Sequence, residues 1–123
     1  MAEKQELGPN QRKWVEALRS GRYEQGPSYL CKEGNYCCLG VGCKAFEVKA
    51  RFIEGGGFFL FGEQETSGFA PEELVQALAL YSDMGDCADG QLPLTAQNDA
   101  GRSFAEIADL LESDPSNWFS EAR

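Results

Sequence analysis

Three of the five cysteines in this chain of 123 residues lie close together, at Cys37, Cys38 and Cys43. Such a cluster has three possible chemistries: a thiolate metal site, a redox site, or small side chains in a tightly packed core. The sequence contains no histidine. Its absence excludes Ser-His-Asp and Cys-His catalytic relays and a histidine general base. We therefore expect no catalytic site.

The spacing of the cysteines favours a core segment over a zinc site. Structural zinc sites pair cysteines with two to four residues between them, whereas Cys37 and Cys38 are adjacent and Cys31 and Cys87 lie further away. A disulfide between adjacent cysteines would be strained, and an odd number of cysteines leaves at least one unpaired. We expect buried thiols and no metal or cofactor, with a zinc-stabilised structural module as an alternative.

A second group of residues, 98–104, could bind an anion. We expect it to join a strand to a helix N-terminus, where free backbone amides attract negative charge. Arg102 could pair with a phosphate and Asn98 could read a base edge. The alternative is local, with Asn98 and Asp99 in an Asx-turn and Ser103 as the helix cap. The candidate ligand-binding residues here are Asn98, Asp99, Arg102, Ser103 and Phe104.

The segment that follows the first expected helix adds three further candidates, Arg22, Tyr23 and Gln25. Arginine beside tyrosine can hold a nucleotide by phosphate pairing and base stacking. A solvated surface with Tyr23 half buried explains the same residues equally well. Both interpretations remain open at the level of sequence.

Hydrophobic periodicity predicts the elements that position these residues. A helix begins at Pro9, carries Trp14 and Leu18 on one face and ends near Gly21. A hairpin over 29–38 leads into a helix that places Leu39, Cys43, Phe46 and Ala50 on one face.

The pattern in the second half of the chain predicts another hairpin over 51–61. Its last four residues, 58–61, are all apolar, which suggests a strand that is covered on both faces or that has one face against a partner subunit. A helix begins at Pro71, and 81–90 is an acidic loop. Residues 91–95 are expected to form an edge strand because Pro93 lacks a backbone donor. Ser103 opens a capping box, and Pro115 ends the helix that follows.

Length and composition predict one α+β domain over 9–123, with three to four helices, a small antiparallel sheet and a flexible arm at 1–8. The net charge is −9, which disfavours direct nucleic-acid binding. No apolar run is long enough for a membrane span, and we expect a cytoplasmic protein.

Three blocks carry a resemblance to a family of small phage and prophage proteins. They are residues 14–26 (WVEALRSGRYEQG), 36–43 (YCCLGVGC) and 98–109 (NDAGRSFAEIAD). The chain is also similar to the phage anti-Thoeris sponges, which sequester cyclic nucleotide signals of bacterial immune systems. This similarity implies a non-enzymatic homo-oligomer with ligand pockets between subunits, acting in the cytoplasm of an infected bacterial cell.

The expected function is therefore phage counter-defence by sequestering a cyclic nucleotide signal without cleaving it. The acidic composition supports an alternative, because 20 acidic residues could imitate DNA on the surface of an inhibitor. Such an inhibitor would bind a defence nucleoprotein such as a CRISPR effector.

Overall fold

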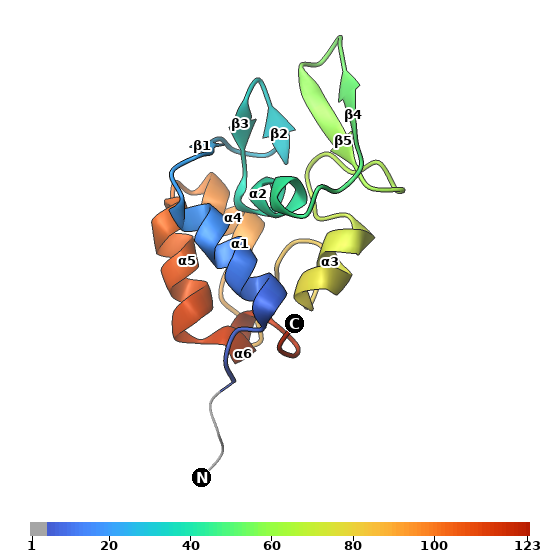
Figure 1. The fold of residues 1–123 in the computed structure, drawn as a ribbon. Helices are drawn as coiled ribbons and strands as arrows, with labels where there is room; N and C mark the ends of the chain where they lie inside the picture. Colours follow the sequence, from blue (N-terminus) through green and yellow to red (C-terminus); the bar gives the residue numbers. More distant parts are fainter. Residues whose placement is uncertain (1–4) are drawn as a thin grey trace.

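The computed structural model describes residues 5–123 and confirms the α+β class (Figure 1). The strands form one small sheet, which lies above α2 and at the opposite end of the molecule from α6. The helices are α1 (Pro9–Arg19), α2 (Cys38–Ala45), α3 (Glu72–Leu78), α4 (Leu94–Asp99), α5 (Phe104–Ser113) and α6 (Pro115–Trp118). The strands are β1 (Glu24–Gln25), β2 (Cys31–Lys32), β3 (Asn35–Tyr36), β4 (Ala50–Ile53) and β5 (Phe58–Phe61).

The sheet has the strand order β1-β3-β2-β5-β4. Both expected hairpins are present, since β2 pairs antiparallel with β3, and β4 with β5. Lys32 pairs with Phe58 and joins the two hairpins, while the short β1 adds parallel to β3. This order leaves β4 at one edge of the sheet.

The core forms where α1, α2 and α5 meet beneath the sheet. Trp14, on the expected apolar face of α1, is fully buried and donates from Nε1 to the carbonyl of Cys38 at 2.9 Å. Its ring meets Phe119 edge to face, with centroids 6.1 Å apart. Arg19 pairs on the surface with Asp109 and Glu112 and so links α1 to α5. Each of these contacts joins segments that are far apart in sequence.

The first residues of the described chain are tied to its last ones. Leu7 is buried in the core, and the buried Gln11 donates to the carbonyls of Leu78 and Glu121 at 2.8 and 2.7 Å. The backbone amide of Gln11 donates to the carbonyl of Arg123 at 3.0 Å. The expected arm at 1–8 is therefore shorter at its C-terminal end, and its residues 1–4 lie outside the described part.

The edge strand expected over 91–95 was wrong, because Leu94 begins the helix α4. Pro93 precedes that helix with φ −63° and ψ 161°, a conformation that proline and an N-cap residue share. The amides of Leu94 and Thr95 donate to the carbonyls of Gly85 and Met84. Carbonyl groups of a neighbouring loop thus accept from the first backbone amides of the helix. Sequence periodicity gives no sign of these bonds.

Two other boundaries differ from expectation. The helix α2 ends at Ala45, so Ala50 does not share its face but begins β4. Pro115 follows the end of α5 as expected, yet it also begins the short helix α6. With α4 and α6 added, the described residues hold six helices rather than the three to four expected.

Gly40 permits α2 to approach closely the backbone just before β2. A Cβ atom at this position would lie 1.7 Å from the carbonyl oxygen of Leu30, which is backbone and cannot move aside cheaply. A glycine inside a helix destabilises it by about 1 kcal/mol relative to alanine. The close contact with the backbone of Leu30 explains why this helix position holds glycine in spite of its lower helix propensity.

Replacing Gly40 with alanine should therefore destabilise the fold by about 1 to 3 kcal/mol or more, in spite of alanine's better helix propensity. Urea unfolding of Gly40→Ala and wild type measures the difference. Gly55→Ala is the matched control, because a Cβ there meets no atom within 4 Å. Equal stability of the two variants would contradict this account.

Candidate functional site

The side chain of Asn98 is 3% exposed and is engaged by the backbone and side chains around it. Its Oδ1 accepts from the amide of Cys38 at 3.2 Å and from Nε2 of Gln25 at 2.9 Å. Its Nδ2 donates to the carbonyl of Gly26 at 3.0 Å. Asn98 therefore joins α4, β1 and the N-terminus of α2, where the preceding Cys37 makes no side-chain capping bond.

This bonding corrects the expectation that Asn98 reads a base edge, because both ends of its amide already have partners. Asp99 also has a local role, since its Oδ1 accepts from the amide of Ser28 at 2.9 Å. Ser28 has a positive φ of 70°, which is unfavourable for a residue with a side chain. The carboxylate thus stabilises a strained turn.

Ser103 forms the expected capping box with Glu106. Its Oγ accepts from the amide of Glu106, whose carboxylate accepts in return from the amide of Ser103 at 3.0 Å. This bond to Ser103 is the main reason that the pKa of Glu106 lies below its usual value. A carboxylate already sits at the N-terminus of α5, which disfavours a second anion there.

The other two candidates of this segment, Arg102 and Phe104, differ in their exposure to solvent. Phe104 is buried in the core, whereas Arg102 is exposed beside a shallow depression of about 300 Å³ that Glu106 also lines. Gln25 is engaged with the carbonyl of Arg102 at 2.7 Å as well as with Asn98. Segment 98–104 and Gln25 therefore mainly hold the fold together.

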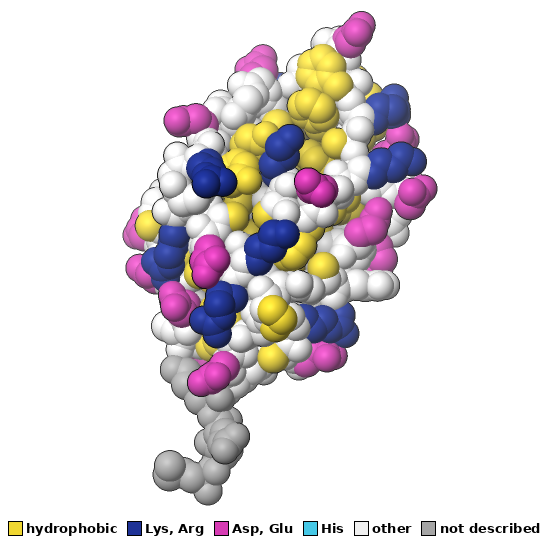
Figure 2. Space-filling view, in the orientation of Figure 1, with side chains coloured by type: hydrophobic (Ala, Val, Ile, Leu, Met, Phe, Trp, Pro, Cys, Tyr) yellow, Lys and Arg dark blue, Asp and Glu magenta, His cyan; other side chains and the backbone are white. Residues whose placement is uncertain are grey.

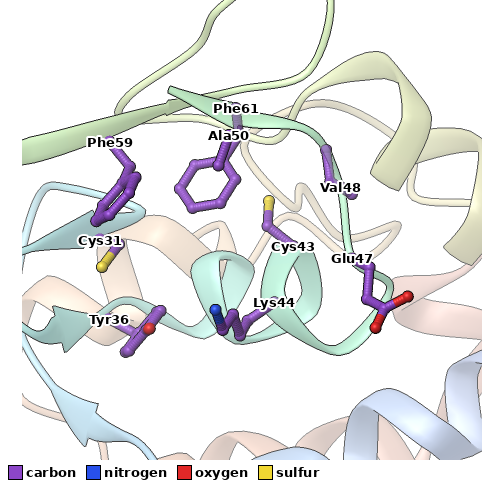
Figure 3. Close-up of a pocket in the computed structure, with 9 residues that line it drawn as sticks. All are labelled: Cys31, Tyr36, Cys43, Lys44, Glu47, Val48, Ala50, Phe59 and Phe61. Carbon is purple, nitrogen blue, oxygen red and sulfur yellow. The ribbon is translucent and has the colours of Figure 1, made fainter. Parts of the chain in front are cut away.

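Arg22 and Tyr23 lie elsewhere, beside two adjoining cavities that share Lys44 and Glu47; together we call these cavities the Lys44 groove. The first is about 350 Å³ and lies between β5 and α2. In Figure 3, the rings of Phe59 and Phe61 and the thiols of Cys31 and Cys43 project into it. Its lining is predominantly apolar.

The second cavity of the groove is about 410 Å³ and is lined by polar residues of α1, α2 and the segment after α1. Tyr23 on its wall meets Tyr36 of the first cavity edge to face, with centroids 5.3 Å apart. Its charged lining residues are Lys13, Arg22, Lys44, Glu16 and Glu47. The groove thus joins an apolar half to a half with a positive net charge.

None of the three basic residues of the groove forms an ion pair within residues 5–123. Lys13 instead lies over the ring of Phe46, 5.0 Å from its centroid. Figure 2 shows Lys and Arg side chains distributed around exposed hydrophobic surface on this face of the molecule. On a chain of net charge −9, the groove is therefore a candidate site for an anion.

The cysteine cluster that marked the sequence is part of the core. Cys37, Cys38 and Cys43 are buried and unpaired, which confirms the interpretation as small buried thiols. Burial raises the pKa of Cys37 to about 11 and raises that of Cys43 further. These thiols are protonated at neutral pH and are poor nucleophiles.

Within the described part of the chain, no three Cys, Asp or Glu residues lie close enough to hold a metal ion together. The zinc-stabilised alternative therefore has no ligand set among residues 5–123. None of the described helices has the length and apolar character needed to cross a membrane.

Comparison with known families gives one match. Residues 6–54 are similar to a family described as a domain of unknown function, DUF8296. No curated protein and no solved structure matches the chain. The matched segment includes α1, β1 to β3, α2 and β4, and so supplies the lining of the Lys44 groove except for Phe59 and Phe61.

The sequence analysis named Arg22 and Tyr23, which line the groove, but it did not name Lys13, Lys44 or Phe59, which line it too. Lys13 and Lys44 look like ordinary solvated lysines in the sequence, because neither belongs to a recognisable motif. The run of four apolar residues at 58–61, three of them phenylalanine, was a usable signal for Phe59, since a strand with apolar residues on both faces must be covered on both faces.

Replacing Asn98 with alanine should lower the free energy of unfolding by about 2 to 4 kcal/mol, because it leaves the buried amide of Cys38 without an acceptor and removes the partly buried bonds to Gln25 and Gly26. Chemical denaturation measures this loss. Asn10→Ala is the control, since its side chain donates a single partly buried bond to the carbonyl of Ala77. A loss no larger than that of the control would show that Asn98 is not a structural centre.

Thiol accessibility gives a second measurement. At pH 8, Ellman's reagent should modify the half-buried Cys87 well before Cys31, Cys37, Cys38 and Cys43, because these four thiols are buried. All five thiols should react in 6 M guanidinium chloride. Rapid modification of the α2 cysteines in the native protein would be inconsistent with the structure.

Proposed function

We propose that the protein binds a nucleotide-type ligand in the Lys44 groove and holds it without cleaving it. The observation that carries this proposal is that an apolar cavity and a positively charged one share Lys44 and Glu47 and are linked by the contact between Tyr23 and Tyr36. A nucleotide has the same division, with a flat base at one end and phosphates at the other.

The chemistry of each half suggests how such a ligand lies. Lys13, Arg22 and Lys44 are free to pair with phosphate oxygens, and arginine can do so through two parallel hydrogen bonds. The base would enter between Phe59 and Tyr36, where aromatic stacking is worth roughly 1 to 3 kcal/mol per base. Each cavity alone falls near the lower end of the usual range for ligand pockets, about 300 to 1,000 Å³.

The protonation states of the titratable side chains that line the apolar cavity support binding over catalysis. Burial raises the pKa of the Cys31 thiol. The pKa of Tyr36 is raised to about 12, mainly by burial and to a smaller extent by the adjacent Cys31. Neither group is a base or a thiolate nucleophile at neutral pH. With no histidine in the sequence, the groove is better suited to holding a phosphate ester than to hydrolysing it.

The biological role that we propose is phage counter-defence, with a cyclic nucleotide immune signal as the ligand. It is supported by the resemblance of residues 14–26, 36–43 and 98–109 to small phage proteins. A sponge of this kind acts in the cytoplasm of the infected bacterial cell. The groove gives it a binding surface on an otherwise acidic protein.

Isothermal titration calorimetry with cyclic di-AMP, cyclic ADP-ribose and AMP tests the binding proposal. We expect at least one probe to bind, and Lys44→Gln to weaken that binding at least tenfold because Lys44 lines both halves of the groove. Mass spectrometry of the ligand released by heat should recover it intact.

Arg102→Gln is the matched control, because Arg102 is exposed in a separate depression. Binding that is lost equally in both variants would place the ligand elsewhere. Failure of every probe to bind, or recovery of a hydrolysed product, would contradict the proposal. Tight binding to a defence nucleoprotein without any nucleotide effect would instead favour the acidic inhibitor.

A further inference from the structure

The charges of this chain are distributed unevenly along the sequence. No lysine or arginine occurs between Arg51 and Arg102, whereas nine of the 20 acidic residues lie there. Because the rest of the chain has equal numbers of acidic and basic residues, residues 52–101 carry the whole net charge of −9. We call them the acidic stretch, which includes α3, α4 and the loop over 81–93 between these helices. A basic partner would be attracted to this part of the molecule.

The acidic stretch also contains all five of the large apolar side chains that are exposed among residues 5–123. Four of the five lie on the loop over 81–93 or beside it, namely Phe69, Tyr81, Met84 and Leu92. Met84 is 42% exposed and Leu92 is 60% exposed. Single exposed apolar side chains are common on protein surfaces, but a group of them is typical of a surface that contacts a partner.

Backbone hydrogen bonds hold three of these residues in one region of the surface: Phe69, Met84 and Leu92. The amide of Ala70, which follows the phenylalanine, donates to the carbonyl of Asp83, which precedes the methionine, at 2.7 Å. The amide of Leu94, two residues after Leu92, donates to the carbonyl of Gly85 at 2.9 Å. The exposed carboxylates of Asp83 and Asp86 lie on either side of this glycine in sequence. We call the three apolar residues and these two aspartates the Met84 surface.

The carboxylates of the Met84 surface are available to a partner. Neither Asp83 nor Asp86 forms an ion pair with any residue of the described chain, 5–123. Other acidic residues of the same stretch differ, since Glu63 and Glu65 pair with basic residues beside them. Negative charge without a cation of this chain, next to exposed apolar side chains, is complementary to a partner that is both basic and apolar.

The loop that carries this surface is held by hydrogen bonds within the chain. Oγ of Ser82 accepts from the amides of Met84 and Asp86 at 3.1 and 3.3 Å. Further along the loop, Oδ1 of the buried Asn117 accepts from the amide of Asp89 at 3.0 Å. A surface that is already ordered loses little conformational entropy when a partner binds, which favours binding.

We propose that the Met84 surface binds a basic amphipathic segment of another protein. The apolar side chains of the segment pack on Met84 and Leu92, and its lysine or arginine side chains pair with the two carboxylates. The flexible, unbranched side chain of methionine suits such a contact, because it adapts to the shape of its partner. The surface differs from an imitation of DNA, whose backbone charges follow one another without apolar groups between them. The proposal does not depend on a ligand in the Lys44 groove.

Fluorescence anisotropy of a labelled peptide of leucine and lysine at helical spacing, LKKLLKLLKKLLKL, tests the surface with the full chain. We expect the peptide to bind, and we expect Leu92→Ser and Asp83→Asn each to weaken binding by about fivefold or more. Phe52→Ser and Glu54→Gln are the matched controls, because they remove an exposed phenylalanine and an exposed carboxylate at β4, away from the loop. Both controls should bind like wild type, and circular dichroism checks that each variant is folded.

A second peptide, SKKSSKSSKKSSKS, keeps every lysine and replaces each leucine with serine. It should bind much more weakly, because it lacks the apolar contacts. No binding of the first peptide, equal binding of both, or equal losses in the controls and the surface variants would overturn the proposal, since attraction by net charge alone would then suffice. Self-association of the chain that Leu92→Ser abolishes, measured by analytical ultracentrifugation, would also overturn it. Lys44→Gln should not weaken peptide binding, which separates this surface from the groove.

Discussion

The buried amide of Asn98 holds together the segments that the rest of the structure depends on. It bonds to Gln25, Gly26 and the first amide of α2, which come from a part of the chain 60 to 73 residues earlier. A buried amide can satisfy several backbone groups only if all of them are placed correctly, so this bonding fixes α2 against α4 and β1. Gly40 then allows α2 to approach the backbone of Leu30.

The position of α2 determines which of its side chains line the Lys44 groove. Its buried face presents the thiols to the core, and its last turn carries Lys44 to the junction of the two cavities. The segment after α1, which Gln25 anchors to Asn98, carries Arg22 and Tyr23 to the same groove. The residues that we propose to bind a ligand and the residues that stabilise the fold are thus neighbours in sequence but distinct in role, which explains why sequence motifs mix the two.

Much of the fold followed from local physics: the proline-initiated α1, the two hairpins, the capping box at Ser103 and the burial of the cysteines. The position of helix α4 did not, because its first amides bond to carbonyls of a loop near Gly85, and the sequence around Leu94 contains no capping motif that would indicate these bonds. Asn98 and Gln25 were assigned to a ligand because an unpaired amide and a structural amide look identical in sequence. Lys44 was missed for the opposite reason, since only the packing of α2 beside β5 gives an ordinary lysine a cavity to line.

The central claim is that the anion-binding surface is the Lys44 groove and not the segment 98–104. Titration of the ¹⁵N-labelled protein with the tightest-binding cyclic nucleotide, followed by two-dimensional NMR, tests it most directly. The account predicts that the amide resonances of Arg22, Tyr23, Lys44 and Phe59 shift together, while those of Arg102 and Ser103 stay in place. Shifts confined to Arg102 and Ser103, or no shifts at saturating ligand, would contradict it.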